Sequence, residues 1–188
     1  MSITRDWRQN REMWVRVLEK QSGQGVDWWN QKIETERFHD EQRLRAWLTQ
    51  QGVTGYAQTL LVMEQFGYPE FLTASADELI EKQYADRPQL RPIYEAIIEA
   101  ASGLGEVIIQ ARKTYVSLRS PRRTFARVQP TTKNRVDLGL RLEGQESGGR
   151  LQPSNIHETM KLQISLRSPD EVDAEVLDWL AKAYLQNS

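Results

Sequence analysis

Residues 113–142, KTYVSLRSPRRTFARVQPTTKNRVDLGLRL, decide the fold of this chain. Apolar and polar side chains alternate in three successive runs, and the apolar members are Thr114, Val116 and Leu118, then Thr124, Ala126 and Val128, then Val136, Leu138, Leu140 and Leu142. A repeat of two predicts β-strands that bury one face and expose the other. Ser120-Pro121 and Pro130-Thr131-Thr132 separate the runs with turn residues, so the strands should pair in an antiparallel sheet.

The flanking residues extend this pattern. Residues 107–110 form a short apolar run, and residues 161–167 alternate again. Ser75 and Glu78 have capping-box spacing at the start of a helical segment, and Ser168-Pro169 opens another near the end of the chain. Residues 75–188 are therefore predicted to form an α+β domain with an antiparallel sheet of four to five strands flanked by helices.

Residues 1–70 have helical periodicity instead. Gly23, Gly52 and Gly67 each end a run whose apolar residues share a helical face, and Val26, Trp29 and Ile33 mark another short helix. Four or five of the six tryptophans lie on these helices. Large aromatic side chains let a small bundle bury enough area to be stable. We expect an N-terminal small helical bundle, a Trp-rich domain that ends near residue 70.

The composition excludes several classes of protein. A hydrophobic share of 39% with 27% charged residues is typical of a globular chain and excludes a wholly disordered one. The absence of cysteine excludes disulfide scaffolds and thiolate chemistry and fits a reducing cytoplasm. No apolar run approaches the roughly 18–20 residues of a membrane span. Residues 1–10 are polar, so no signal peptide and no membrane partner are expected.

The net charge of −1 hides a strongly uneven distribution. Residues 111–142 hold nine basic side chains and one acidic side chain, Asp137, whereas the rest of the chain is acidic. The basic stretch coincides with the predicted strands. One face of the sheet should therefore be basic.

The same residues resemble a known family. The segments 113–119, 125–133 and 135–140, together with residues 168–184, are similar to a family of uncharacterised bacterial domains, over about residues 75–185. Arg45-Ala46-Trp47-Leu48 and Gly55-Tyr56-Ala57 resemble a small helical domain of unknown function that often precedes it. Some members carry the label predicted transport protein, which nothing in this chain supports. Relatives fused to nuclease-like domains point toward nucleic acid, and the resemblance brings no catalytic residues.

The polar face of the predicted sheet is the candidate binding site. Its members are basic, amide or aromatic side chains: Lys113, Tyr115, Arg119, Arg123, Phe125, Arg127, Gln129, Lys133, Arg135 and Arg141. Arginines would bind phosphates and the rings of Tyr115 and Phe125 would stack on bases, so single-stranded nucleic acid is favoured over duplex. Two alternatives stand beside this hypothesis. The face could bind a small anion, or it could pack against another element while the helical domain docks a protein partner.

Other motifs fail on inspection. His39 and His157 are the only histidines and lie in different domains, so no metal site, cofactor site or catalytic residue is expected. The segment 40–67 has the outline of a helix-turn-helix. Its second helix, residues 54–67, has no Lys or Arg, which makes it a poor recognition helix.

Overall fold

The computed structural model describes residues 7–188, so most of the polar N-terminal stretch in which no signal peptide was expected, residues 1–6, lies outside it. By their contacts the described residues divide into two compact units, one ending at Ala74 and the other running from Ser75 to Ser188. Each unit has its own hydrophobic core. The chain is α+β, with helices first and a sheet afterwards, as predicted.

The N-terminal unit is a bundle of helices. Their bounds are α1 Trp7–Ser22, α2 Val26–Glu36, α3 Glu41–Gln50, α4 Gly55–Phe66 and the short α5 Glu70–Thr73. Asp40 caps α3, because its side chain accepts a hydrogen bond from the Arg43 backbone N–H at 2.8 Å. Leu18, Ile33 and Leu44 lie fully buried in the centre of the bundle.

The tryptophans of this unit serve its packing. Trp29 is buried and contacts Trp47 edge to face, with ring centroids 6.0 Å apart. The Lys32 ammonium lies 5.1–5.4 Å from the ring centroids of Trp28, Trp29 and Trp47. The aromatic cluster therefore supplies core area and cation–π contacts within the bundle itself.

The C-terminal unit begins with helices and ends with one. These are α6 Ala76–Tyr84, the 3-10 turn η1 Pro88–Leu90, α7 Arg91–Ser102, the 3-10 turn η2 Pro169–Glu171 and α8 Ala174–Asn187. Ser75 and Glu78 form the predicted capping box at the start of α6. Asp173 caps α8 and accepts a hydrogen bond from the Val176 backbone N–H.

The sheet has six antiparallel strands, and their order is β1-β2-β3-β4-β6-β5. The bounds are β1 Ile108–Ala111, β2 Val116–Arg119, β3 Thr124–Thr132, β4 Arg135–Leu140, β5 Gln152–His157 and β6 Met160–Leu166. The predicted count of four to five was one or two strands short. The strand that was not predicted is β5, whose sequence QPSNIH is polar, has no apolar repeat and contains a proline.

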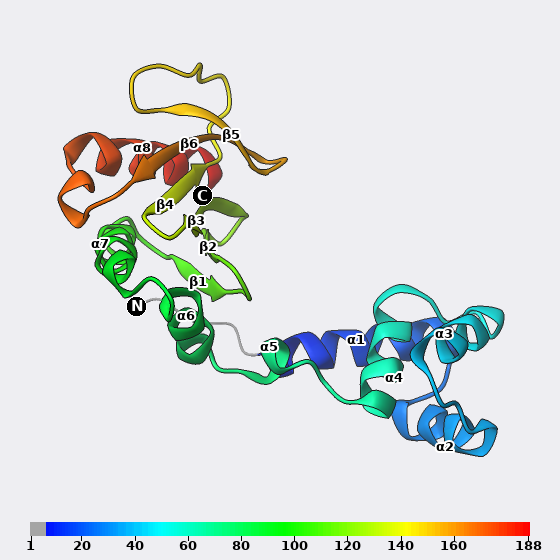
Figure 1. The fold of residues 1–188 in the computed structure, drawn as a ribbon. Coiled ribbons are helices and arrows are strands. Elements are labelled where there is room, and N and C mark those ends of the chain that lie inside the picture. The colour runs from blue at the N-terminus through cyan, green and yellow to red at the C-terminus, as the bar shows by residue number, and fades with distance from the viewer. Residues whose placement is uncertain (1–6) are drawn as a thin grey trace. The chain divides into compact units, whose positions relative to one another are not determined.

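One face of the sheet packs against α7 and α8, which lie together on one side of it (Figure 1). The strand residues of this core face are Val116, Leu118, Ala126, Val128, Val136, Leu138, Leu140, Leu162, Ile164 and Leu166, and all are buried. The predicted apolar faces of these strands are thus correct except at two threonines. Thr114 precedes β2 and is exposed, and Thr124 pairs with Arg119 and lies with it on the opposite side of the sheet. We call the opposite side the outer face.

Phe125 corrects the predicted orientation of one side chain. It was expected on the outer face beside Tyr115, but it is 0% exposed and packs edge to face on Tyr184 of α8, with ring centroids 5.3 Å apart. Leu118 pairs with Ala126 while Arg119 pairs with Thr124, so Phe125 is the extra residue of a β-bulge. A bulge breaks the alternation of faces and here turns the ring into the core.

Candidate functional site: an arginine-lined depression on the sheet

A depression of about 460 Å³ lies on the outer face. Its floor comes from β1, β2 and β3, through Gln110, Ser117 and Arg127, and its lining also includes His157, Thr159 and Met160 from the end of β5, the turn after it and the start of β6. The six arginines that line it are Arg112, Arg119, Arg122, Arg123, Arg127 and Arg141. No lining residue of this depression is Asp or Glu. We call this site the arginine depression.

A glycine in β4 lets the β5–β6 hairpin form one side of the depression. Gly139 alternates with the core residues Leu138 and Leu140, so it faces outward. A Cβ there would lie 2.4 Å from Ile156 Cδ1 and 3.3 Å from Met160 Cβ. Because glycine has no side chain, Ile156 packs directly on the β4 backbone and β5 folds over the outer face.

Arg127 is held in a fixed position in the centre of the site. Its guanidinium carbon lies 3.4 Å from the centroid of the Tyr115 ring, and its Nη1 donates a hydrogen bond of 2.6 Å to the Ile156 carbonyl oxygen. Stacking and hydrogen bonding together orient the planar guanidinium. Arg127 therefore covers one face of Tyr115, so that face cannot stack on a base.

Three other arginines have side chains without a partner among the described residues. The side chains of Arg119, Arg122 and Arg141 make no hydrogen bond or salt bridge with any residue in the described range 7–188. Among the described residues, the Arg112 guanidinium donates only to the Gln110 side chain, at 3.3 Å. The guanidinium groups of this set keep most of their donors available for an anion.

Arg123 differs because a carboxylate reaches it. Its Nη2 lies 3.0 Å from Glu143 Oε1 and 3.4 Å from the Gln186 carbonyl oxygen. Gln186 also bonds the Glu143 backbone, accepting from its N–H at 3.0 Å. Glu143 is thus held at the edge of the site, where its carboxylate forms a salt bridge with Arg123.

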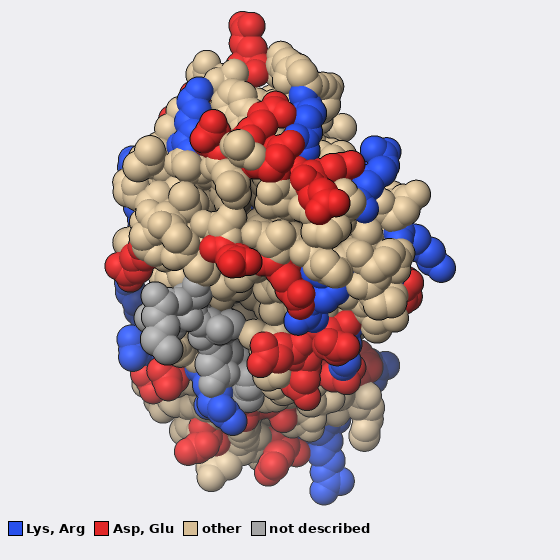
Figure 2. Space-filling model, turned by 90° about the vertical axis from the view of Figure 1, so that its left-hand side faces the viewer, with Lys and Arg blue, Asp and Glu red and all other residues tan. Residues whose placement is uncertain are grey.

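The lining of the depression differs in charge from the side of the sheet that the helices cover. Figure 2 shows many Asp and Glu side chains, with Lys and Arg among them, on the side where α7 and α8 lie, whereas the lining of the depression has six arginines and no carboxylate. Clustered like charges repel one another, and an anion bound among them relieves that repulsion. The geometry therefore favours a ligand with several negative charges.

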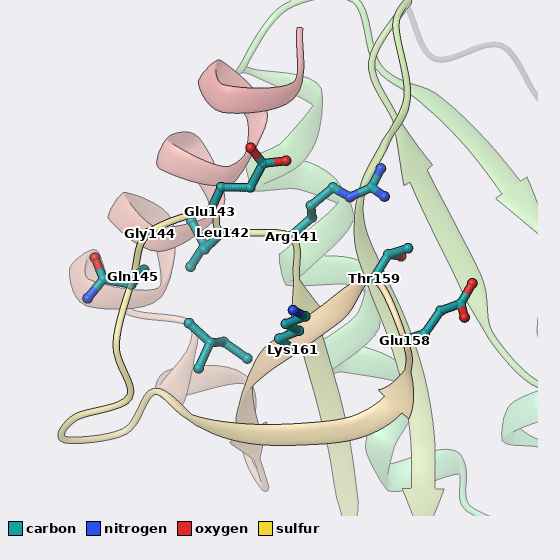
Figure 3. A pocket seen from close by; sticks show the side chains of 9 residues that line it. Arg141, Leu142, Glu143, Gly144, Gln145, Glu158, Thr159 and Lys161 are labelled. Carbon is teal, nitrogen blue, oxygen red and sulfur yellow. The ribbon is translucent and has the colours of Figure 1, made fainter.

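A second depression of about 450 Å³ adjoins the first. Figure 3 shows its lining, with Arg141 and Lys161 at one opening and Glu143, Gln145 and Glu158 around it. Arg141 and Thr159 line both depressions. The two hollows are therefore contiguous.

The ten predicted site residues divide into two groups. Tyr115, Arg119, Arg123, Arg127 and Arg141 come together at the arginine depression, whereas Lys113, Phe125, Gln129, Lys133 and Arg135 do not line it.

Two of the remaining residues are engaged elsewhere. Arg135 pairs with Asp137, the one acid predicted to be exposed on this face, which is only 1% exposed and also accepts a hydrogen bond from Ser165. Lys133 lies in the exposed turn after β3, where its carbonyl oxygen accepts a hydrogen bond from Gln89.

Metal and membrane features are not found in the described part of the chain. Between residues 7 and 188 no group of three or more His, Asp or Glu side chains is placed to hold a metal ion. The helices over the same range include none that is long and apolar enough to cross a membrane. His157 lines the arginine depression, and its Nδ1 accepts a hydrogen bond from the Thr159 backbone N–H at 3.2 Å.

The comparison with protein families identifies the unit that carries this site. A family model described as a domain of unknown function, DUF5655, matches residues 80–187. The chain belongs to this family. The predicted resemblance of the C-terminal part to an uncharacterised domain family is confirmed, and every residue of the arginine depression lies within the DUF5655 domain. No curated protein and no solved structure gives a significant match.

Sequence reasoning missed eight of the thirteen residues that line the site in the DUF5655 domain, among them two arginines, a histidine and a threonine. Arg112 and Arg122 belong to the basic stretch but follow a strand end and a turn, outside the alternating positions. Their positive charge was the feature of the sequence that could have placed them in the site. No feature of the sequence indicated His157 and Thr159, because β5 was not predicted.

Proposed function

We propose that the DUF5655 domain of this protein binds single-stranded nucleic acid through its sugar–phosphate backbone. The observation that carries the proposal is the set of six arginines around one depression without a carboxylate in its lining. Guanidinium groups bind phosphate oxygens in pairs and at fixed angles. The three arginines without internal partners are the groups most available for this contact.

Phosphate contacts, and not base stacking, carry the proposed affinity. Phe125 is buried and one face of Tyr115 is covered, so the aromatic platform expected on this surface is missing. A flexible single strand can bend into a concave site, whereas the phosphates of a duplex lie on a stiff convex rod. We expect weak sequence preference and a strong dependence on salt.

A compact anion is the second candidate ligand. The volume of the depression, about 460 Å³, lies within the range of roughly 300–1,000 Å³ that is typical of small-molecule sites. A nucleotide or polyphosphate would satisfy the same arginines. Inorganic triphosphate as a competitor therefore separates the two candidates, since a polymer ligand should resist displacement by it.

The proposal includes a protein partner for the helical unit and a cytoplasmic location. Trp28, Tyr56 and Phe66 are exposed by 42%, 60% and 39%, and large exposed apolar side chains are typical of protein-docking surfaces. A protein partner for this unit remains part of the proposal. The cysteine-free composition favours a cytoplasmic location.

The test is a binding titration with labelled single-stranded RNA, single-stranded DNA and duplex DNA, read by fluorescence anisotropy over a range of salt concentrations. Reversing Arg119 and Arg122 to Glu should weaken single-strand binding and, for the two lost phosphate contacts, lower the slope of log K against log salt by about 1.4. Arg167→Glu makes half of this charge change outside the depression and should cost much less than half of the lost binding free energy. Absence of binding at low salt, or equal losses in both variants, would exclude the proposal.

A further inference from the structure

The two depressions share two lining residues, and this arrangement suits a ligand long enough to lie in both. Arg141 follows β4 directly and lines both hollows, and Thr159 in the β5–β6 turn does the same. A ligand that leaves the arginine depression past Arg141 therefore enters the second one. A mononucleotide has no need of this second space, whereas a chain of phosphates does.

Lys161 is the group that this extension would meet. It lies in β6, is exposed, and makes no hydrogen bond or salt bridge with any described residue of the chain. Figure 3 shows its side chain near the backbone at Arg141, whose own side chain points away from Lys161. Glu143, which also lines this hollow, already pairs with Arg123 at 3.0 Å. Arg141 and Lys161 are thus two cations without internal partners at one opening, with Glu158 at its margin.

We propose that the arginine depression and the Arg141–Lys161 opening form one continuous track for a chain of consecutive phosphates. The inference rests on the proposed function and specifies it: the ligand is a polymer of several nucleotides. Arg119, Arg122 and Arg127 bind its first phosphates, Arg141 binds at the junction, and Lys161 binds a phosphate farther along. A short oligonucleotide would fill only the arginine depression.

The dependence of affinity on length tests this track. Trinucleotide and dodecanucleotide thymidylates are titrated against the full chain and against Lys161→Gln and Arg119→Gln, the trinucleotide by competition at high concentration. Lys161→Gln should weaken the dodecanucleotide alone and lower its salt slope by about 0.7, the value for one phosphate contact on a single strand. Arg119→Gln should weaken both lengths. Arg167→Gln, directly after the same strand, is the matched control and should change neither.

The outcomes separate the two proposals. If Lys161→Gln leaves the dodecanucleotide unaffected while Arg119→Gln still weakens it, the track is wrong and nucleic-acid binding stands. Equal loss for both lengths with Lys161→Gln also overturns the track, because Lys161 would then act on the first site. If neither length binds the unmodified protein, both proposals fail. Circular dichroism of each variant confirms that the fold is intact.

Discussion

The arginines of the depression differ in how much side-chain conformational entropy each loses when a ligand binds. Arg127 is already oriented by the Tyr115 ring and the Ile156 carbonyl, so it loses little side-chain entropy when a phosphate binds. Arg119 and Arg141 have no such partners and must be ordered by the ligand. Arg127 is therefore suited to set the position of an anion, and its neighbours to add charge.

Phe125 should matter for stability and not for binding. Phe125→Ala removes a fully buried ring that packs on Tyr184, and should lower the free energy of unfolding by about 3–5 kcal/mol. Urea denaturation measures this loss. Tyr115→Ala, at a partly exposed ring, is the control and should cost less stability. A Phe125→Ala protein with unchanged stability but lost nucleic-acid binding would contradict the burial of this ring in solution.

Glu143 should act as an internal competitor for the ligand. Its carboxylate pairs with Arg123 in a partly exposed salt bridge, for which a typical value is about 0.2–1 kcal/mol. Glu143→Gln frees Arg123 and should tighten single-strand binding by about two- to fivefold, read from anisotropy titrations at low salt. Glu146→Gln makes the same charge change in the same loop and serves as the control. If both variants bind more tightly by the same factor, the cause is the net charge of the protein and not the release of Arg123.

At the scale of elements, β5 determines how much of the outer face is open. It pairs with β6 and places Ile156 over Gly139 of β4. Asp137, also on the outer face of β4, is buried. The arginine depression remains open at β1, β2 and β3, with His157 and Thr159 at its margin. The site is thus the part of the basic face that the hairpin leaves uncovered.

Two tyrosines between α6 and α7 should make the fold sensitive to high pH. Burial raises the pKa of Tyr94 from its usual value of 10.0 to about 12, and burial raises the pKa of Tyr84 as well. The rings contact each other, with centroids 5.6 Å apart. Because the unfolded phenols ionise first, their contribution is complete below pH 10 and is lost as the pH rises toward 12.

The measurement is the free energy of unfolding in urea at a series of pH values across this interval. The decline should be shallower in Tyr94→Phe, which removes one of the two titrating hydroxyls. An equally steep decline in this variant would show that other groups cause it.

At the scale of the whole molecule, each unit has a core of its own, and the DUF5655 match lies in the second unit. We expect residues 75–188 to fold alone and to bind single-stranded nucleic acid with the same affinity and salt slope as the full chain. Circular dichroism and anisotropy of the fragment test this expectation. A folded fragment with much weaker binding would show that the helical unit contributes to the site.

The alternating strands and helix caps could be predicted because their causes are local. The repeat of two in residues 135–140 places Val136 and Leu138 in the core wherever the strand pairs, and the capping box of Ser75 and Glu78 needs only three residues of spacing. The basic character of residues 111–142 likewise follows from composition. These features indicated an α+β chain with a basic sheet face and five of the thirteen residues that line the candidate site.

The shape of the site depended on contacts between residues far apart in the sequence. The bulge that buries Phe125 exists only in the pairing of β2 with β3, and the ring finds its place against Tyr184, far along the chain. Gly139 and Ile156 meet because β5 folds back over β4, which the polar sequence of β5 does not indicate. Local periodicity assigns a side chain to a face. Only cross-strand register and packing decide whether that face is open to a ligand, because both are set by residues far apart in sequence.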